Sequence, residues 1–229
     1  MFRSLIKGWV GEKVTQLGMW AKLDRQVYRR CHDVIVPSRN GTTQIDHILV
    51  SRYGIFVIET KNYKGWIFGD AYAARWTVSH FGKKFPFQNP LRQNFRHTQC
   101  LAEYLHLDHS VFHSAVFFIG ECEFKTPMPP NVMTEGLTTY IRSFGDLLLS
   151  EGQITAVVTS LAGLKGDPRL TKTVHLESLA QRHAASSVCP HCGSALVERA
   201  ARSGATAGSK FLGCASYPRC RFTRTIRSA

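Results

Sequence analysis

GIFVIETKNYKG, residues 54–65, is an apolar run that ends in an acid and a base. The continuous run Ile55–Ile58 is typical of a strand buried on both faces. Glu59 and Lys61 follow two positions apart, so on a strand their side chains leave the same face. Because burying charges is costly unless they pair or bind something, this strand end predicts a polar site at the edge of the core.

A partner for Glu59 lies on the preceding expected strand. The stretch 44–51, QIDHILVS, places Asp46 among apolar residues, and the turn RYG folds it back on the next strand as a hairpin. Asp46 and Glu59 are seven and six residues from Tyr53. Residues at similar heights on adjacent strands lie close together, so two carboxylates and one ammonium are expected to converge.

Two carboxylates and a lysine are the groups that metal-dependent phosphodiester hydrolysis uses. Carboxylate oxygens hold Mg²⁺, or Mn²⁺, and leave metal positions for water and a substrate phosphate. The metal polarises the phosphoryl group and lowers the pKa of a bound water, while a lysine offsets negative charge in the transition state. An ordinary salt bridge at a sheet edge is the alternative, because a bare Glu-x-Lys triplet is common.

The remaining pattern predicts an α/β domain with a mixed β-sheet flanked by helices. Asn40-Gly41 marks a hairpin turn, and Asn89-Pro90 opens a helix. The expected strands are 27–37, 44–51, 54–61, 65–70, 75–80 and 113–120, and the expected helices are 3–23, 91–107, 144–149, 154–164 and 173–183.

The charge of the chain favours a polyanionic partner. Among 229 residues, 29 Lys and Arg stand against 16 Asp and Glu, a net charge of +13. Nucleic acid is the commonest such partner, with acidic lipids or a solvated basic surface as alternatives. No apolar run reaches the ~18 residues that span a bilayer, and the first residues lack the features of a signal peptide. We therefore expect a cytoplasmic protein that binds nucleic acid and no membrane, and no oligomeric state is predicted.

Four of the seven cysteines cluster near the C-terminus with the spacing of metal ligands. Cys189 and Cys192 form a C-x2-C pair, and Cys214 and Cys220 follow as a C-x5-C pair. Four thiolates complete a tetrahedral Zn²⁺ site with no open position, which is typical of a structural zinc. A module this short has little core, so we expect the metal to supply most of its folding energy.

A small polar stretch separates this module from the rest of the chain. AASS at 184–187 is the expected linker between a domain at 1–183 and the zinc module at 188–229. Residues 184–229 carry seven basic residues against one acid, so the tail is the more densely basic part.

Three blocks of the first domain resemble the nuclease-related domain (NERD) family of the PD-(D/E)XK nuclease superfamily: GEKV at 11–14, QIDHILVSRYGIFVIETKNYKGWIFGD at 44–70 and NPLRQNFRHTQCL at 89–101. The resemblance covers about residues 8–120 and implies a restriction-endonuclease-like mixed sheet. It implies that Asp46 and Glu59 are metal ligands and that Lys61 is the catalytic lysine. It also implies a further carboxylate, Glu12, from the first helix, and a polar side chain, Gln93, that faces the site from the helix at 91–107.

Two histidines lie close to these positions in the sequence. His47 should point away from Asp46, because neighbours on a strand leave opposite faces, so we expect a structural role. His97 is four residues beyond Gln93 on one helix face, so it could reach the site, but we expect it to be a polar residue of that helix.

The tail resembles the C4 zinc finger at the C-terminus of bacterial type I topoisomerases. The stretches CPHCGSALVERAARSG and KFLGCASYPRCRFTRTI carry the resemblance, with a lengthened loop between them. It implies a zinc-ribbon-like module that binds DNA, including single strands, through stacking faces and cations. At least one of Phe211 and Phe222 is expected in the small core. The residues expected to contact nucleic acid are Lys210, Tyr217, Arg219, Arg221 and Arg224.

These features together predict a Mg²⁺-dependent deoxyribonuclease with a zinc-finger DNA-binding tail. A non-catalytic nucleic-acid-binding adaptor on a nuclease fold is an alternative, and a ribonuclease is another. Strand preference, sequence specificity and endonuclease or exonuclease action are left open.

Overall fold

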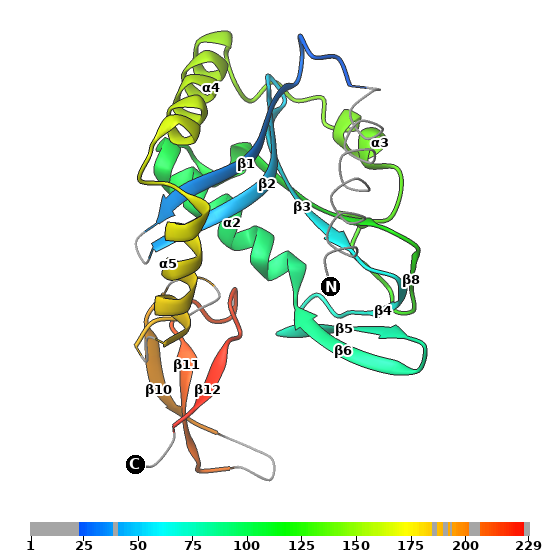
Figure 1. Ribbon diagram of the computed structural model, residues 1–229, viewed down its shortest axis with the longest axis vertical. Helices are drawn as coiled ribbons and strands as arrows, with labels where there is room; N and C mark the ends of the chain where they lie inside the picture. The colour runs from blue at the N-terminus through cyan, green and yellow to red at the C-terminus, as the bar shows by residue number, and fades with distance from the viewer. Residues whose placement is uncertain are drawn as a thin grey trace.

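The computed structural model describes residues 23–38, 41–184, 187–189, 192, 194–201 and 207–226. The helix expected at 3–23, and with it Glu12, lies outside the described residues except for Leu23. Within these ranges the chain builds a mixed α/β domain and a small three-stranded C-terminal sheet (Figure 1). The expected fold class is thereby confirmed.

A five-stranded mixed sheet forms the centre of the first domain, in the order β1-β2-β3-β7-β9. Strands β1 to β3 are consecutive and antiparallel, whereas β3–β7 and β7–β9 are parallel pairs. The apolar run of β3 is therefore paired on both edges, as its unbroken hydrophobic character predicts. The strands are β1 (Arg29–Ser38), β2 (Gly41–Ser51), β3 (Gly54–Asn62), β7 (Phe112–Ile119) and β9 (Val132–Met133).

Helices cover both faces of this sheet. One face packs against α2 and α4, where Val57 meets Leu101 and Leu161 in one buried cluster. The opposite face packs against α3 through Phe56 and Ile141. The helices are α2 (Pro90–Leu105), α3 (Leu137–Arg142), α4 (Glu151–Gly166) and α5 (Lys172–Ala184), with a 3-10 turn at His109–Val111.

A second sheet of four strands, in the order β6-β5-β4-β8, extends from the first (Figure 1). It is fixed to the core by Trp76, which is almost fully buried and stacks on Phe118 of β7 with ring centroids 6.2 Å apart. Its strands are β4 (Gly65–Phe68), β5 (Arg75–His80), β6 (Lys83–Gln88) and β8 (Cys122–Phe124). The zinc module adds β10 (Leu196–Ala200), β11 (Lys210–Cys214) and β12 (Thr223–Thr225).

One expected helix is wrong. Residues 144–149 have no helical structure, and the helix lies earlier, at Leu137–Arg142. The backbone N–H groups of Leu148 and Leu149 both donate to the carbonyl of Arg52, which commits this segment to the β2–β3 turn. Among the described helices, none combines the length and the hydropathy needed to cross a bilayer.

Candidate functional site

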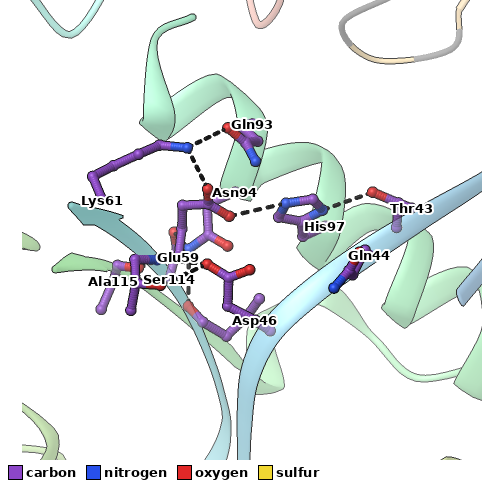
Figure 2. Close-up of polar contacts among 12 residues, drawn as sticks. Thr43, Gln44, Asp46, Glu59, Lys61, Gln93, Asn94, His97, Ser114 and Ala115 are labelled. Carbon is purple, nitrogen blue, oxygen red and sulfur yellow. Dashed lines mark hydrogen bonds and ion pairs between the residues drawn. The ribbon is translucent and has the colours of Figure 1, made fainter. Parts of the chain in front are cut away.

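The β2–β3 hairpin brings the two expected carboxylates to its open end. The register pairs His47 with Ile58, so the next pair along the strands would be Asp46 and Glu59. The ladder ends there, and Oδ2 of Asp46 accepts hydrogen bonds from the backbone N–H of Thr60 at 2.9 Å and from its hydroxyl at 2.8 Å. The side chain of Asp46 thus occupies the opening between two strands that separate (Figure 2).

Glu59 is the centre of a hydrogen-bonded network. Lys61 Nζ donates to its Oε1 at 2.5 Å and to Oε1 of Gln93 at 2.9 Å. On the other side, His97 Nε2 lies 3.1 Å from Glu59 Oε2, and His97 Nδ1 lies 2.7 Å from the hydroxyl of Thr43. With the ring neutral, Nε2–H donates to Glu59 and the Thr43 hydroxyl donates to Nδ1. Figure 2 shows this chain from Lys61 through Glu59 and His97 to Thr43.

The two carboxyl groups differ in their electrostatics. Burial and the nearby charge of Glu59 raise the pKa of Asp46 to about 6. Burial also opposes ionisation of Glu59, but the hydrogen bond from His97 and the charge of Lys61 outweigh it and hold its pKa below the usual value. Glu59 therefore ionises more readily than an ordinary glutamate, while Asp46 ionises less readily than an ordinary aspartate.

Helix α2 presents the side chains of Gln93 and His97 to Lys61 and Glu59, and Asn89 fixes where this helix begins. The side chain of Asn89 caps the helix by accepting from Leu91 N at 2.9 Å, and Pro90 occupies the first turn. Its Nδ2 lies within hydrogen-bonding distance of three carbonyls of the β4–β5 connection, at Asp70, Ala71 and Ala73. A fully buried asparagine thus ties the start of α2 to the second sheet.

Asn94 joins α2 to the central strands next to the same site. Its Nδ2 is 2.9 Å from the Val57 carbonyl, 2.8 Å from Ser114 Oγ and 3.0 Å from the Ala115 carbonyl. It is fully buried, and its Oδ1 has no hydrogen-bond partner in the described part of the chain. Asn94 was not expected as a site residue, because a single helical asparagine carries no signal for its tertiary partners.

The structure therefore brings four of the expected residues together: Asp46, Glu59, Lys61 and Gln93. His47 points away from them and contacts His32, with 2.8 Å between the two Nδ1 atoms, as expected for a structural role. The expectation that His97 is an ordinary helix residue is wrong, because it is buried against Glu59. Its spacing of four from Gln93 was the available signal.

The four tail cysteines also converge. Their Sγ atoms all lie within 4.8 Å of one another, and the four side chains form the small core of the module with Leu196. Hydrogen bonds from the thiols of Cys189 and Cys220 hold the pKa of Cys192 far below its usual range. A clustered set of four sulfur donors, three of them buried, fits Zn²⁺.

The zinc module presents aromatic and basic side chains around a hollow of about 710 Å³. Arg199 and Arg221 each place a guanidinium 5.8 Å from the ring centroid of Tyr217. Phe222 packs in the cysteine core, as expected for one of the two phenylalanines. Among the other expected contact residues, Arg219 is exposed, Arg224 lies 5.7 Å from the Phe222 ring, and Lys210 pairs with Glu198 at 2.8 Å.

Two arginines connect the zinc module to the first domain. Arg221 lies 5.0 Å from the ring centroid of Tyr72 in the β4–β5 connection. Arg92 of α2 is 8% exposed and donates through Nη2 to the Tyr72 carbonyl at 2.5 Å. Burial lowers the pKa of Arg92, and the cysteine cluster opposes that shift. Arg92 thus lies within electrostatic range of the cysteines, one position before Gln93.

Comparison with known proteins agrees with this division. The nuclease-related domain family matches residues 7–119, and the topoisomerase DNA binding C4 zinc finger matches residues 186–229. A 96-residue stretch is 50% identical to an uncharacterized protein of Bacillus anthracis, which amounts to 42% of this chain and 45% of that protein. The chain thus spans less than half of that relative's length. No solved structure matches the chain.

Proposed function

We propose that this chain, whose residues 7–119 match the nuclease-related domain family, hydrolyses phosphodiester bonds of DNA with a divalent metal ion. The observation that carries the proposal is the convergence of Asp46, Glu59, Lys61 and Gln93 at the open end of one hairpin. Residues 1–183 would be the nuclease domain, 184–187 a linker and 188–229 a zinc-bearing DNA-binding module.

The carboxylates suit a hard divalent cation such as Mg²⁺ or Mn²⁺. Oδ2 of Asp46 is held by Thr60, while Oδ1 accepts no hydrogen bond from the described residues. The raised pKa of Asp46 reflects burial and its proximity to Glu59, a repulsion that a bound cation would relieve. When bound, the metal would polarise the phosphate and acidify a water. Glu12 is a candidate further carboxylate that lies outside the described residues.

Lys61 has the geometry to act on the reacting phosphate. Two of its three ammonium hydrogens are directed to Glu59 and Gln93, which leaves one donor for a substrate oxygen or the attacking water. The water oxygen attacks phosphorus, the bond to the leaving sugar oxygen breaks, and that oxygen takes up a proton. Gln93 would hold the ammonium in place, and His97 would keep Glu59 ionised and oriented.

A cleavage assay tests the proposal. The full-length protein should cut DNA with Mg²⁺ and not with EDTA, and Lys61→Ala should reduce the rate by about a hundredfold or more, the usual effect of losing a transition-state donor. Lys165→Ala, which changes an exposed lysine of α4, is the matched control and should cut normally.

The substrate panel separates the alternatives. Supercoiled plasmid, linear duplex, single-stranded DNA and RNA should be tested side by side. Preferential cleavage of RNA would favour a ribonuclease. Binding without cleavage of any substrate, unaffected by EDTA, would favour a non-catalytic adaptor and contradict the proposal.

A further inference from the structure

The β5–β6 hairpin has a composition that its folding does not explain. Residues 75–88, RWTVSHFGKKFPFQ, contain three cations and no acid. Its base is held in place, because Trp76 is buried and its Nε1 donates to the Asp70 carbonyl at 2.8 Å, while Phe87 packs on Tyr63 with ring centroids 4.6 Å apart. The tip is different, since His80 pairs with Lys83 and only Phe81 and Gly82 form the turn.

Phe81 is both strained and exposed. Its φ is 48° and that of Gly82 is 73°, so both central residues are in the left-handed region that two-residue type I′ hairpin turns require. Asn and Gly tolerate this conformation, whereas a bulky aromatic residue is disfavoured there. Phe81 is also 91% exposed, so its ring gains almost no burial in return. Strained residues of this kind are concentrated at functional positions.

The surroundings of Phe81 indicate what its ring would meet. Lys83 and Lys84 follow it and are exposed, and the His80 ring lies 4.2 Å from the Phe81 ring centroid. A flat apolar ring flanked by cations suits a partner that carries phosphates and stackable bases. A hydrophobic protein surface would not account for the absence of acids along the whole hairpin.

The hairpin is also placed to contact a substrate. Strand β6 leads through Asn89 into α2 (Figure 1), and Gln93 of α2 is only five residues beyond Gln88, the last residue of β6. Six residues of strand separate base from tip, which corresponds to about 20 Å, or about six base steps of duplex. The zinc module lies on the other side of the start of α2 (Figure 1), and its Arg221 contacts the ring of Tyr72 in the β4–β5 connection.

We propose that the β5–β6 hairpin is a DNA-binding arm whose Phe81 ring stacks on a base of the DNA that is bound at Asp46, Glu59 and Lys61. The inference rests on the proposed nuclease function for the identity of the substrate. The arm would bind DNA without sequence readout, with Lys83 and Lys84 on phosphates and Phe81 on or between bases.

Phe81→Asn is the decisive variant because it creates the favoured Asn-Gly turn and should leave the protein at least as thermally stable as the wild type. DNA affinity is measured with full-length protein in EDTA, by fluorescence anisotropy on a labelled duplex and single strand. We expect Phe81→Asn to bind roughly five- to a hundredfold more weakly, the range of one lost base stack. Phe81→Trp should retain affinity, and Leu147→Asn, at a position 71% exposed in the coil after α3, is the control and should bind normally.

The outcomes separate this inference from the proposed function, because binding in EDTA needs no cleavage. If Phe81→Asn binds DNA more weakly but the wild type never cuts DNA, the DNA-binding role of the hairpin is supported and the proposed nuclease function is contradicted. Cleavage by the wild type with unchanged affinity of Phe81→Asn would overturn the arm alone. Phe81-dependent binding to anionic phosphatidylserine vesicles, with DNA affinity unchanged, would assign the tip to a membrane surface and also overturn the inference.

Discussion

At the scale of single residues, the site places two buried carboxyl groups close enough that their negative charges repel each other. Glu59 is stabilised as an anion by His97 and Lys61, whereas Asp46 is destabilised as an anion by burial and by Glu59. For Asp46, the folded pKa of about 6 lies above the ordinary aspartate value of 3.8, which applies to the unfolded chain. Stability of the metal-free protein is therefore lost as pH rises from the unfolded to the folded pKa, and the loss is complete above about pH 7.

Asp46→Asn should consequently stabilise the metal-free protein while it abolishes cleavage. Asparagine keeps an oxygen for the Thr60 donors and carries no charge, so it removes a penalty of about 3 kcal/mol at most. We expect a higher Tm than wild type in EDTA at pH 7.5 and little difference at pH 4.5. Added Mg²⁺ should raise the Tm of the wild type and leave that of the variant unchanged. A variant less stable at pH 7.5 would contradict this account.

His97→Leu tests whether His97 acts through Glu59. Loss of the Nε2–H donor should raise the pKa of Glu59, which moves the acid limb of the pH–rate profile to higher pH. Residues that orient metal ligands typically contribute 10- to 100-fold, so the rate at neutral pH should fall by about that factor. His97→Gln, which keeps a donor, should restore part of the rate. Equal loss in both variants with an unmoved acid limb would indicate packing alone.

The sequence predicts the Asp46–Glu59 pairing because the register of a short hairpin follows from its turn and its apolar pattern. The bond between His97 and Glu59 was not predictable, since helical spacing gives a face and not the angle at which α2 docks. For the same reason the tertiary bonds of Asn94 were missed.

At the scale of elements, α2 contributes Gln93 and His97 to the site, and Asn89 fixes where α2 begins. Strand β6, which precedes α2, was not predicted for two reasons. Pro86 argues against a strand, although an edge strand tolerates proline, and Phe-Gly is an unusual sequence for a hairpin turn. The expected helix at 144–149 was wrong because its amides bind the carbonyl of Arg52, a tertiary contact that no local pattern encodes.

Asn89→Ala should destabilise the protein by about 2–3 kcal/mol. The substitution removes the helix cap, worth about 1 kcal/mol, and leaves the carbonyls of Ala71 and Ala73 without their buried donor. Chemical denaturation should show a lower midpoint with an unchanged slope. Asn62→Ala, at the exposed end of β3, is the matched asparagine control and should change stability little.

At the scale of the whole molecule, the zinc module and the site share α2. Arg92 is buried and donates to the Tyr72 carbonyl, and the charges of the cysteine cluster act on its guanidinium. Its Nη1 has no hydrogen-bond partner among the described residues. A zinc ion with four thiolates carries net negative charge, which compensates a buried guanidinium. Zinc removal should therefore weaken the first domain as well as the tail.

The comparison of wild type with Arg92→Met measures this coupling. A zinc chelator should lower the Tm of the wild type and increase the rate of hydrogen exchange at the amides of α2. In Arg92→Met, whose side chain needs no counter-charge, chelation should affect α2 less. If chelation changes hydrogen exchange of α2 equally in both proteins, the two parts are energetically independent.

The parallel pairing of β3 with β7 also dictates an order of events during synthesis. Ile55 pairs with Phe112, so the hairpin that carries Asp46 and Glu59 leaves the ribosome long before its neighbouring strand exists. Lys61 cannot bond to Gln93 until Gln93 has been synthesised. The proposed catalytic arrangement cannot assemble until residue 119, the end of β7, has emerged. Until then the apolar edge Ile55–Ile58 is unpaired and open to wrong partners. The proposed cleavage of DNA would therefore be absent in the same interval in which the unfinished sheet is open to wrong pairing.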